Sequence, residues 1–355
     1  MDHAHWMSRC LQLARLGASS AAPNPMVGAV LVKGDRILAE GWHQRPGSAH
    51  AERDCLKRFG DSPVPEDALL YVSLEPCAHH GRTPPCADLI IERGVKRVVV
   101  AHNDPFPQVN GQGIELLRRA GIEVIEGVLA DEARWMNRRF LTSVTKQRPY
   151  IVLKWAQSRD GFLDQHPRSA RGVQRISSPE TDVLVHRWRS EEQAILVGST
   201  TVHNDDPRLD VRHVEGRQPL RVVIDRGNRA PADSHVFDGT QATLLITTGE
   251  RSGIQAEQVI IAPEEDPIDR LLIELNERGI RSLVVEGGAQ LHAHFLQRGS
   301  WDEARMITGA GLFGSGTSAP RIASCIARSM EHAPDRIDYF INESQQALPG
   351  EAWPW

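Results

Sequence analysis

The chain has 355 residues, of which 40% are hydrophobic and 25% are charged, and its formal net charge is -5. This length predicts two domains of roughly 150–200 residues each. The acidic balance argues against a general nucleic-acid or membrane surface, although a local basic pocket can still bind a small anionic ligand.

The N-terminal segment carries an acid and two histidines where a secretory signal needs cations and an apolar core. No later run approaches the ~18 apolar residues of a membrane span. We therefore expect a cytoplasmic protein with neither nucleic acid nor membrane as a partner. The five cysteines are an odd number in a large chain, and in a reducing compartment they are expected to be buried, metal-bound or catalytic rather than disulfide-bonded.

The first part of the chain alternates strand-like apolar runs with helical patterns, which predicts a three-layer α/β domain. The expected strands span residues 27–32, 37–40, 69–74, 95–101 and 122–125. The expected helices span residues 2–17, 48–59, 86–92, 113–119 and 131–140. Glycines just before two of the strands fit helix ends.

A second alternation of strands and helices begins at residue 150, so we predict a second α/β domain. Its expected strands span residues 150–155, 194–197, 220–225, 243–248, 259–261, 282–286 and 304–308. Its expected helices span residues 179–189, 267–277 and 289–298. A polar segment that ends at a proline, 143–149, is the expected linker, which gives domains 1–145 and 146–355. The last ~35 residues carry only weak signals, and no element is predicted there.

A group of potential metal ligands occurs at strand-to-helix junctions of the first domain. His50 opens a predicted helix for which Ser48 is a candidate N-cap, Cys77 follows a strand, and Cys86 heads another helix. One imidazole and two thiolates would form a zinc site with one open position for water. Glu52, which is not a ligand, is placed to transfer the proton of that water if it lies in the first helical turn.

This order of residues matches the H-x-E and P-C elements of the zinc-deaminase signature, but eight residues rather than two separate the cysteines. His79 and His80 are rival ligands between the two cysteines. A tight loop cannot easily bring both histidines back onto the same ion, so we rank them as pocket residues.

Three segments of the first domain read PNPMVG at 23–28, GWH followed by HAE within 41–52, and EPCAHHGRTPPC at 75–86. These segments resemble the deaminase half of the bifunctional riboflavin-biosynthesis deaminase/reductase family. The similarity continues through 104–124 and covers residues 1–145, and the eight-residue gap is the family's own spacing. It implies a cytidine-deaminase-like fold, zinc held by His50, Cys77 and Cys86, and Glu52 as proton shuttle.

The resemblance also implies the substrate, a phosphoribosylaminopyrimidine that loses an exocyclic amine by hydrolysis. Asn24 would contact the pyrimidine, and His43, His79 and Arg82 would face the ribose phosphate. A structural capping role is the alternative for the last three residues.

In the second half, no G-x-G-x-x-G follows a strand, so the usual dinucleotide fingerprint is absent. The segment GSTTVHNDDPRLDVR at 198–212 directly follows a strand and is either a ligand loop or ordinary turn chemistry. At 283–296 a strand, Glu-Gly-Gly and a helix follow one another. This arrangement either presents backbone N–H groups to a phosphate or is a glycine-rich corner.

Together these segments resemble the reductase half of the same family, which has a dihydrofolate-reductase-like α/β fold and uses NADPH. By this resemblance Thr201 and Asp205 contact the nucleotide, whereas Leu209 and Arg212 contact the substrate. Ala156 would lie near the nicotinamide. The remaining implied residues are Arg189 for the substrate phosphate, Glu286 for the substrate, and Gly288, Ala289, Gln290, Leu291, His292, Ala293 and His294 for the cofactor pyrophosphate.

The second half departs from the family pattern at three positions. Val173 stands where the family has a substrate-binding serine, and Arg175 stands where it has an aromatic residue beside the cofactor. Arg159 replaces an expected leucine. An arginine at 175 can still stack on the cofactor or pair with one of its phosphates.

We therefore expect a two-domain enzyme that uses zinc and NADPH for consecutive steps of riboflavin synthesis. The first step is deamination of the diaminopyrimidinone ribosylamine phosphate. The second is hydride delivery to C1 of the ring-opened ribose imine, which yields a ribityl chain. A homo-oligomer is left open.

Two alternatives remain at this point. One is a zinc deaminase of another base or nucleoside, such as guanine or tRNA adenosine, with a degenerate reductase-like domain. The other is a non-enzymatic module with a closed structural zinc site, whose fourth ligand would be His79, His80 or Cys55, and a nucleotide-sensing second domain.

Overall fold

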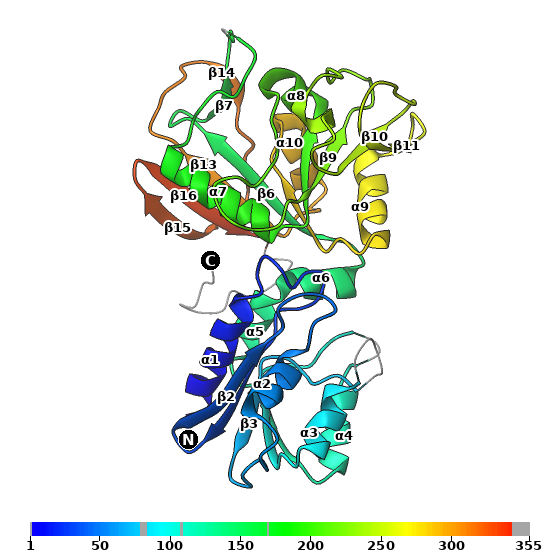
Figure 1. Cartoon of the computed structure of the whole chain (residues 1–355). Helices are drawn as coiled ribbons and strands as arrows, with labels where there is room; N and C mark the ends of the chain where they lie inside the picture. The colour runs from blue at the N-terminus through cyan, green and yellow to red at the C-terminus, as the bar shows by residue number, and fades with distance from the viewer. Residues whose placement is uncertain (1, 79–83, 107–108, 169, 343–355) are drawn as a thin grey trace. The chain divides into compact units, whose positions relative to one another are not determined.

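The computed structural model describes residues 2–78, 84–106, 109–168 and 170–342. These residues form two compact units that meet in sequence between Gln147 and Arg148. The course of the chain through the units is shown in Figure 1. No helix in the described part is both long enough and apolar enough to cross a membrane.

The first unit is built on a mixed sheet with the strand order β2-β1-β3-β4-β5. The β1 strand runs antiparallel to β2 and β3, whereas β3, β4 and β5 are parallel to one another. Its strands are β1 (Gly28–Lys33), β2 (Arg36–Trp42), β3 (Leu69–Val72), β4 (Arg97–Val100) and β5 (Glu123–Glu126). Its helices are α1 (His3–Arg15), α2 (Ala51–Phe59), α3 (Cys86–Glu92), α4 (Gln112–Arg119), α5 (Ala130–Met136) and α6 (Arg138–Lys146).

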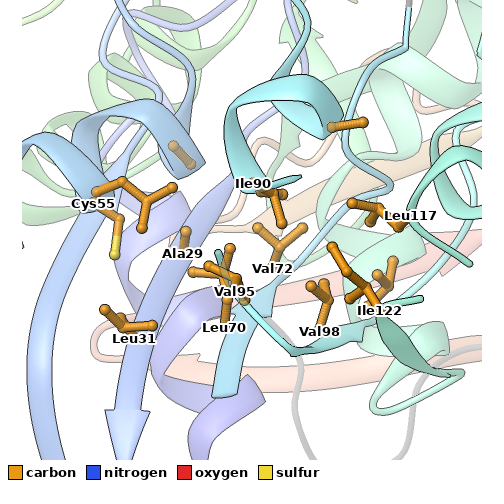
Figure 2. Packing of buried hydrophobic residues seen from close by; sticks show 14 of the residues in the cluster. Ala29, Leu31, Cys55, Leu70, Val72, Ile90, Val95, Val98, Leu117 and Ile122 are labelled. Atoms are coloured by element: carbon orange, nitrogen blue, oxygen red, sulfur yellow. The ribbon is translucent and has the colours of Figure 1, made fainter. Parts of the chain in front are cut away.

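The two faces of this sheet carry separate hydrophobic clusters because successive strand residues point to opposite sides. Leu70 and Val72 face α2, α3 and α4, and Figure 2 shows them in one cluster with Cys55 and Ile90. Tyr71 faces the opposite layer, which contains α1 and α5. Helices therefore cover both faces of the sheet, and the predicted three-layer domain is confirmed.

The structure corrects two predictions at the end of this unit. The single helix expected over 131–140 is two helices, which are separated at Asn137. The side chain of Asn137 accepts a hydrogen bond from Met26 N and donates one to Met26 O, so a contact 111 residues away fixes the break. The expected linker 143–149 is also too long, because α6 continues to Lys146.

The second unit contains a nine-stranded sheet of order β11-β10-β9-β8-β12-β6-β13-β16-β15. Neighbouring strands from β11 to β13 are parallel, as expected for strands linked through helices. Its strands are β6 (Tyr150–Gln157), β7 (Phe162–Gln165), β8 (Ala194–Gly198), β9 (Leu220–Ile224), β10 (Thr243–Thr247), β11 (Glu257–Ile260), β12 (Ser282–Val285), β13 (Glu303–Thr308), β14 (Gly316–Ser318), β15 (Ile326–His332) and β16 (Asp335–Ile341). Its helices are α7 (Pro179–Glu191), α8 (Ser199–Asp205), α9 (Pro267–Glu277) and α10 (Ala289–Gln297), with a short 3-10 turn at His235–Phe237.

The C-terminal strands β15 and β16 were not predicted from the sequence. β16 pairs antiparallel with β13, and β15 pairs antiparallel with β16 at the edge of the sheet. Buried Asp335 at the start of β16 accepts hydrogen bonds from Ser178 N and Thr181 Oγ1 at the start of α7. The described part of the C-terminal segment, although its local pattern is weak, therefore completes the fold.

Candidate active sites

The first candidate site lies at one edge of the smaller sheet. Because β1 is antiparallel to both of its neighbours, the start of β1 meets the ends of β2 and β3 at this edge. Asn24 precedes β1, His43 follows β2, and Cys77 follows β3. Strand direction therefore brings together three predicted site residues that are up to 53 positions apart.

Three metal-ligand atoms converge there. One ligand atom each from His50, Cys77 and Cys86 lie within 4.8 Å of one another, and this is the only such group of ligands found among the described residues. His50 Nδ1 lies 3.6 Å from the Sγ of Cys77 and 3.4 Å from that of Cys86. One nitrogen and two sulfurs fit zinc, which prefers these donors in a tetrahedron and keeps one position for water at catalytic sites.

Each of the two cysteines changes the pKa of the other. Hydrogen bonds from Cys86 and His50 lower the pKa of Cys77 to about 4, although burial opposes this shift. The hydrogen bond to Cys77 and burial raise the pKa of Cys86 well above its usual value. The pair therefore shares one proton without a cation, and a divalent cation favours loss of that proton as well.

Cys55 is excluded as a fourth ligand. Its thiol lies 3.4 Å from Ala39 O and packs into the apolar cluster drawn in Figure 2. Burial raises its pKa to about 12, so it remains a thiol. None of the five cysteines forms a disulfide, as predicted. His79 and His80 lie outside the described residues.

Glu52 lies in the first turn of α2, for which His50 is the N-cap residue. Its side chain is hydrogen-bonded with Cys86, and the residue is 3% exposed. Burial raises its pKa to about 7. The predicted N-cap, Ser48, is wrong: its hydroxyl bonds the backbone of Arg45 and does not cap the helix.

Glu75, which sequence reasoning did not single out, anchors the loop that carries Cys77. Its buried carboxylate accepts hydrogen bonds from four backbone N–H groups, those of Asp104, Gly111, Gly113 and Ile114. Gly113 also packs so closely that an added Cβ would lie 1.8 Å from Pro76 O. The start of α4 therefore fixes the backbone next to the second ligand.

His43 and Asn24 form one wall of this site. Asn24 Nδ2 lies 3.0 Å from His43 Nε2, and His43 Nδ1 lies 3.1 Å from Ala49 O. Burial lowers the pKa of His43, so its ring is neutral near pH 7. The ring of His43 also packs edge-on against that of His50, with 5.6 Å between ring centroids. His79 and Arg82, the other two predicted contacts, lie outside the described residues.

The second candidate site is a cleft of about 750 Å³ in the larger unit. Its lining includes residues at or beyond the carboxyl ends of β6, β8, β9 and β12, which is where ligands bind in open parallel sheets. Fifteen predicted residues line it: Ala156, Val173, Arg175, Arg189, Thr201, Asp205, Leu209, Arg212, Glu286, Gly288, Ala289, Gln290, Leu291, His292 and His294. Ala293 is not among the lining residues.

Arg189 and Glu286 form a buried bidentate ion pair in this cleft. Arg189 Nε and Nη2 donate to the two carboxylate oxygens at 2.8 and 2.7 Å, and Lys154 Nζ lies 3.6 Å from Glu286. Burial opposes ionisation of Glu286, but the charges of Arg189 and Lys154 outweigh it and lower its pKa to about 2. Arg189 also donates to Asp210 O, which leaves two of its five N–H groups for a ligand.

The segment predicted as a ligand loop at 198–212 begins with the helix α8. Thr201 lies in this helix and Asp205 ends it. Arg168 donates to Asp205 at 2.5 Å and to Asp164 at 2.8 Å, so it links α8 to β7. Sequence reasoning missed Arg168 because no motif surrounds it.

The Glu-Gly-Gly turn after β12 packs closely against α8, and only glycine fits at its second residue. A Cβ on Gly287 would lie 2.9 Å from Thr201 Oγ1, and Gly288 has a φ of +78°. His292 is buried behind the corner, with Nδ1 2.9 Å from Gly288 O and Nε2 3.2 Å from Lys154 O. The side chain of His292 therefore supports the turn.

Two of the three departures from the family pattern, Val173 and Arg175, line the cleft. Val173 is 66% exposed, and Arg175 donates to Asp182 on α7 at 2.5 Å. Arg159 lies in the turn after β6, where its backbone N–H bonds Gly311 O, and it does not line the cleft. The side chain of Arg175 is therefore held by the ion pair with α7, and the rest of it is exposed to solvent.

Two family models match the chain. The model of the cytidine and deoxycytidylate deaminase zinc-binding region matches residues 1–102, and that of the RibD C-terminal domain matches residues 149–325. The riboflavin biosynthesis protein RibD of Aquifex aeolicus is 40% identical, with 88% of each chain covered. The protein of the same name from Escherichia coli is 38% identical, with 98% of each chain covered.

Solved structures show the same similarity over both units. A diaminohydroxyphosphoribosylaminopyrimidine deaminase/5-amino-6-(5-phosphoribosylamino)uracil reductase from Thermotoga maritima is 35% identical, with a TM-score of 0.86. RibD of Acinetobacter baumannii is 33% identical, with a TM-score of 0.83. Each comparison covers 95% of this chain and 98% of the other.

Proposed function

The chain belongs to the RibD family of bifunctional riboflavin-biosynthesis enzymes, a zinc-dependent deaminase joined to an NADPH-dependent reductase, and we propose how its residues divide that work. The smaller unit deaminates 2,5-diamino-6-(5-phosphoribosylamino)pyrimidin-4-one. The larger unit then reduces the ribosyl group of the product to a ribityl group.

In the deaminase unit, His50, Cys77 and Cys86 hold the zinc ion, and Glu52 transfers protons. When bound, zinc supplies the Lewis acid that makes a water molecule nucleophilic at neutral pH. Glu52 accepts the proton of that water and returns a proton to the departing amine. Its position in the first turn of α2, against Cys86, supports this role.

Asn24 and His43 orient the pyrimidine. The contact between Asn24 Nδ2 and His43 Nε2, together with the contact between His43 Nδ1 and Ala49 O, holds both side chains at the wall of the site. His79 and Arg82 remain proposals for the ribose phosphate from the sequence pattern alone.

In the reductase unit, Arg189 and Arg212 bind the substrate phosphate, and Glu286 orients both the arginine and the substrate. The two N–H groups that Arg189 keeps free suit phosphate oxygens. NADPH supplies the hydride, and the protein orients it and excludes water. Thr201 and the backbone at Gly288 to His292 lie where the dinucleotide would pass, beyond the ends of β8 and β12.

The observation that carries the deaminase assignment is the convergence of His50, Cys77 and Cys86 within 4.8 Å, beside a buried carboxylic acid that is not one of the three ligands. A closed structural zinc site would need a fourth protein ligand. Among the described residues Cys55 does not supply it, because its thiol packs into the core. For the same chain we propose a cytoplasmic location and a small pyrimidine ribose phosphate as ligand.

The test is to incubate the full-length protein with the diaminopyrimidine substrate, with and without NADPH, and to identify the products by mass. Without NADPH we expect only the deaminated ribosyl compound, and with NADPH the ribityl compound. Removal of zinc by a chelator should stop deamination but leave reduction of added deaminated substrate intact. Deamination that survives complete zinc removal would contradict the proposed site.

A further inference from the structure

Arg168 lines the reductase cleft, but its guanidinium is used almost completely by the protein itself. Its Nε lies 2.8 and 3.0 Å from the two carboxylate oxygens of Asp164. Its Nη1 donates to Gly172 O at 3.1 Å and to Asn204 O at 3.0 Å, and its Nη2 donates to Asp205 Oδ1 at 2.5 Å. Four of its five N–H groups are therefore engaged, which suits a residue that holds other groups in place.

The contact with Asn204 fixes Arg168 against the C-terminal end of α8. Asn204 is the last residue but one of this helix, so its carbonyl has no partner within the helix. The same carbonyl oxygen also accepts a hydrogen bond from Gly172 N at 2.7 Å. A cation at this end of a helix is favoured by the helix dipole as well. The guanidinium of Arg168 therefore has a defined position relative to α8.

Asp205 is bound by Arg168 through only one of its two oxygens. In the part of the chain that the structure describes, no group donates a hydrogen bond to Asp205 Oδ2, and Asp205 lines the cleft. Burial raises the pKa of Asp205, whereas the hydrogen bond from Arg168 lowers it, so the arginine favours the charged form. A carboxylate only accepts hydrogen bonds. Its ligand must therefore offer a donor such as a hydroxyl group, and a phosphate is excluded.

The position of Asp205 on α8 indicates which ligand offers that donor. Asp205 and Thr201 are four residues apart in this helix, so they share one face of it. Thr201 packs against the Glu-Gly-Gly turn, where a Cβ on Gly287 would lie 2.9 Å from its Oγ1. A dinucleotide whose pyrophosphate lies on that turn passes the same face of α8, and its riboses carry hydroxyl groups.

We propose that Arg168 is a positioning residue of the reductase, which holds the Asp205 carboxylate so that its free oxygen meets a ribose hydroxyl group of NADPH. The inference rests on the proposed reductase function. In this arrangement Arg168 acts on the cofactor through Asp205 and makes no contact with it. Removal of Arg168 should therefore weaken NADPH only as long as Asp205 is present.

The experiment titrates the full-length protein with NADPH by calorimetry and measures turnover of the deaminated substrate. Arg168→Ala should weaken NADPH binding roughly 10-fold, the size of one coupled contact. The KM for NADPH should rise in parallel, whereas kcat should change by less than about twofold, because the lost contact binds the ground state and the transition state equally. A fall in kcat with an unchanged KM would contradict the proposal.

A double-mutant cycle tests whether Arg168 acts through Asp205. Asp205→Ala should weaken NADPH binding by a similar factor, and Arg168→Ala added to it should weaken binding further by less than about twofold. Two effects that multiply instead would overturn the proposal. They would mean that Arg168 either binds the nucleotide directly or only supports the fold.

Two further variants separate positioning from general damage. Arg168→Lys should recover part of the lost affinity, because it restores the charge but not the planar fork. Arg171→Ala is the matched control: Arg171 Nε donates to His203 O on the same helix, but its ion-pair partner is Asp206 and it does not line the cleft. It should change NADPH affinity by less than about twofold. An equal loss in Arg171→Ala would show that contact with α8, and not the orientation of Asp205, sets the affinity.

The outcomes distinguish this proposal from the function on which it rests. If the wild-type chain binds no NADPH, the reductase function itself is contradicted. If the wild-type chain binds NADPH and Arg168→Ala binds it as tightly, the function stands and the role of Arg168 is wrong. The same conclusion follows if Asp205→Ala keeps full affinity. Thermal unfolding of each variant shows whether a loss of affinity is merely a loss of folded protein.

Discussion

The two candidate sites use their polar groups in opposite ways. In the deaminase unit, three ligand atoms lie within 4.8 Å of one another, beside the buried carboxyl group of Glu52. In the reductase unit, charged side chains from helices and loops form ion pairs with one another in a cleft of about 750 Å³. Deamination therefore depends on the three ligand atoms and one carboxyl group. Reduction depends on a network of ion pairs that hold one another in place.

This difference predicts that single substitutions act as all-or-none events in the deaminase unit and as graded changes in the reductase unit. It also predicts that each activity survives damage to the other. The following experiments are ordered from the largest expected effect to the smallest.

Glu52→Gln should lower deaminase turnover by about 10²- to 10⁴-fold, because the proton acceptor is lost while the size of the side chain is kept. Zinc content, measured by atomic absorption, should stay at one per chain, and reduction of added deaminated substrate should be unaffected. Asp54→Asn, on the same helix but hydrogen-bonded to Trp42 N and Arg58, is the control and should change deamination little. Substantial deamination by Glu52→Gln would exclude the role of Glu52.

Gly113→Ala should lower deaminase activity by roughly 10- to 100-fold, since its Cβ would meet Pro76 O at 1.8 Å and push the Cys77 loop outward. Zinc affinity, measured by competition with a chelator, should fall in parallel. Glu115→Ala on the exposed side of α4 is the control. If Gly113→Ala retains normal zinc affinity and activity, the contact between Gly113 and Pro76 O is not needed to hold Cys77 in place.

Glu286→Gln should destabilise the larger unit by about 3–5 kcal/mol, because Arg189 and Lys154 remain buried without a counter-charge. Hydrogen exchange at β8 and β12 should report this loss, while exchange in the smaller unit stays the same. Glu257→Gln, whose ion pair with Arg278 is largely exposed, should cost no more than about 1 kcal/mol.

The pH dependence of the same variant sharpens this prediction. The folded-state pKa of Glu286 is lowered to about 2 from an ordinary 4.5, so its contribution to stability is complete above about pH 4.5. That contribution is lost as the pH falls towards 2. The stability of the wild-type unit should therefore decline between pH 4.5 and 2 more steeply than that of Glu286→Gln. Equal slopes would mean that the ion pair contributes nothing.

Arg175→Trp should have the smallest effect, a rise of about 3- to 10-fold in kcat/KM for NADPH, because an aromatic ring beside the cofactor adds stacking contacts. The cost of releasing Asp182 is small, since the Arg175 side chain is 66% exposed. Arg175→Ala separates the two effects: it removes the ion pair and adds no ring. An equal gain in the alanine variant would show that the arginine merely obstructs the cleft.

The parts of the fold that the sequence predicts are those governed by local pattern. Alternating strands and helices predict both α/β units, because burial on one or two faces imposes a period on apolar residues. The break at Asn137 and the strands β15 and β16 escape this reasoning. Asn137 bonds Met26, far away in sequence, and Asp335 at the start of β16 bonds Thr181 on α7, so neither contact leaves a local signal.

The sequence by itself determined the chemistry of the zinc site, because the residue type fixes which atom can bind a metal. His50, Cys77 and Cys86 could be chosen for that reason and by their resemblance to a family. Only the tertiary structure decided what holds them: Glu75 bonds four backbone N–H groups, and Gly113 leaves room for Pro76. The same holds for Glu286, whose buried ion pairs with Arg189 and Lys154 form only in the folded chain. A charge can be read from a sequence, but whether it is already paired depends on contacts that only folding makes.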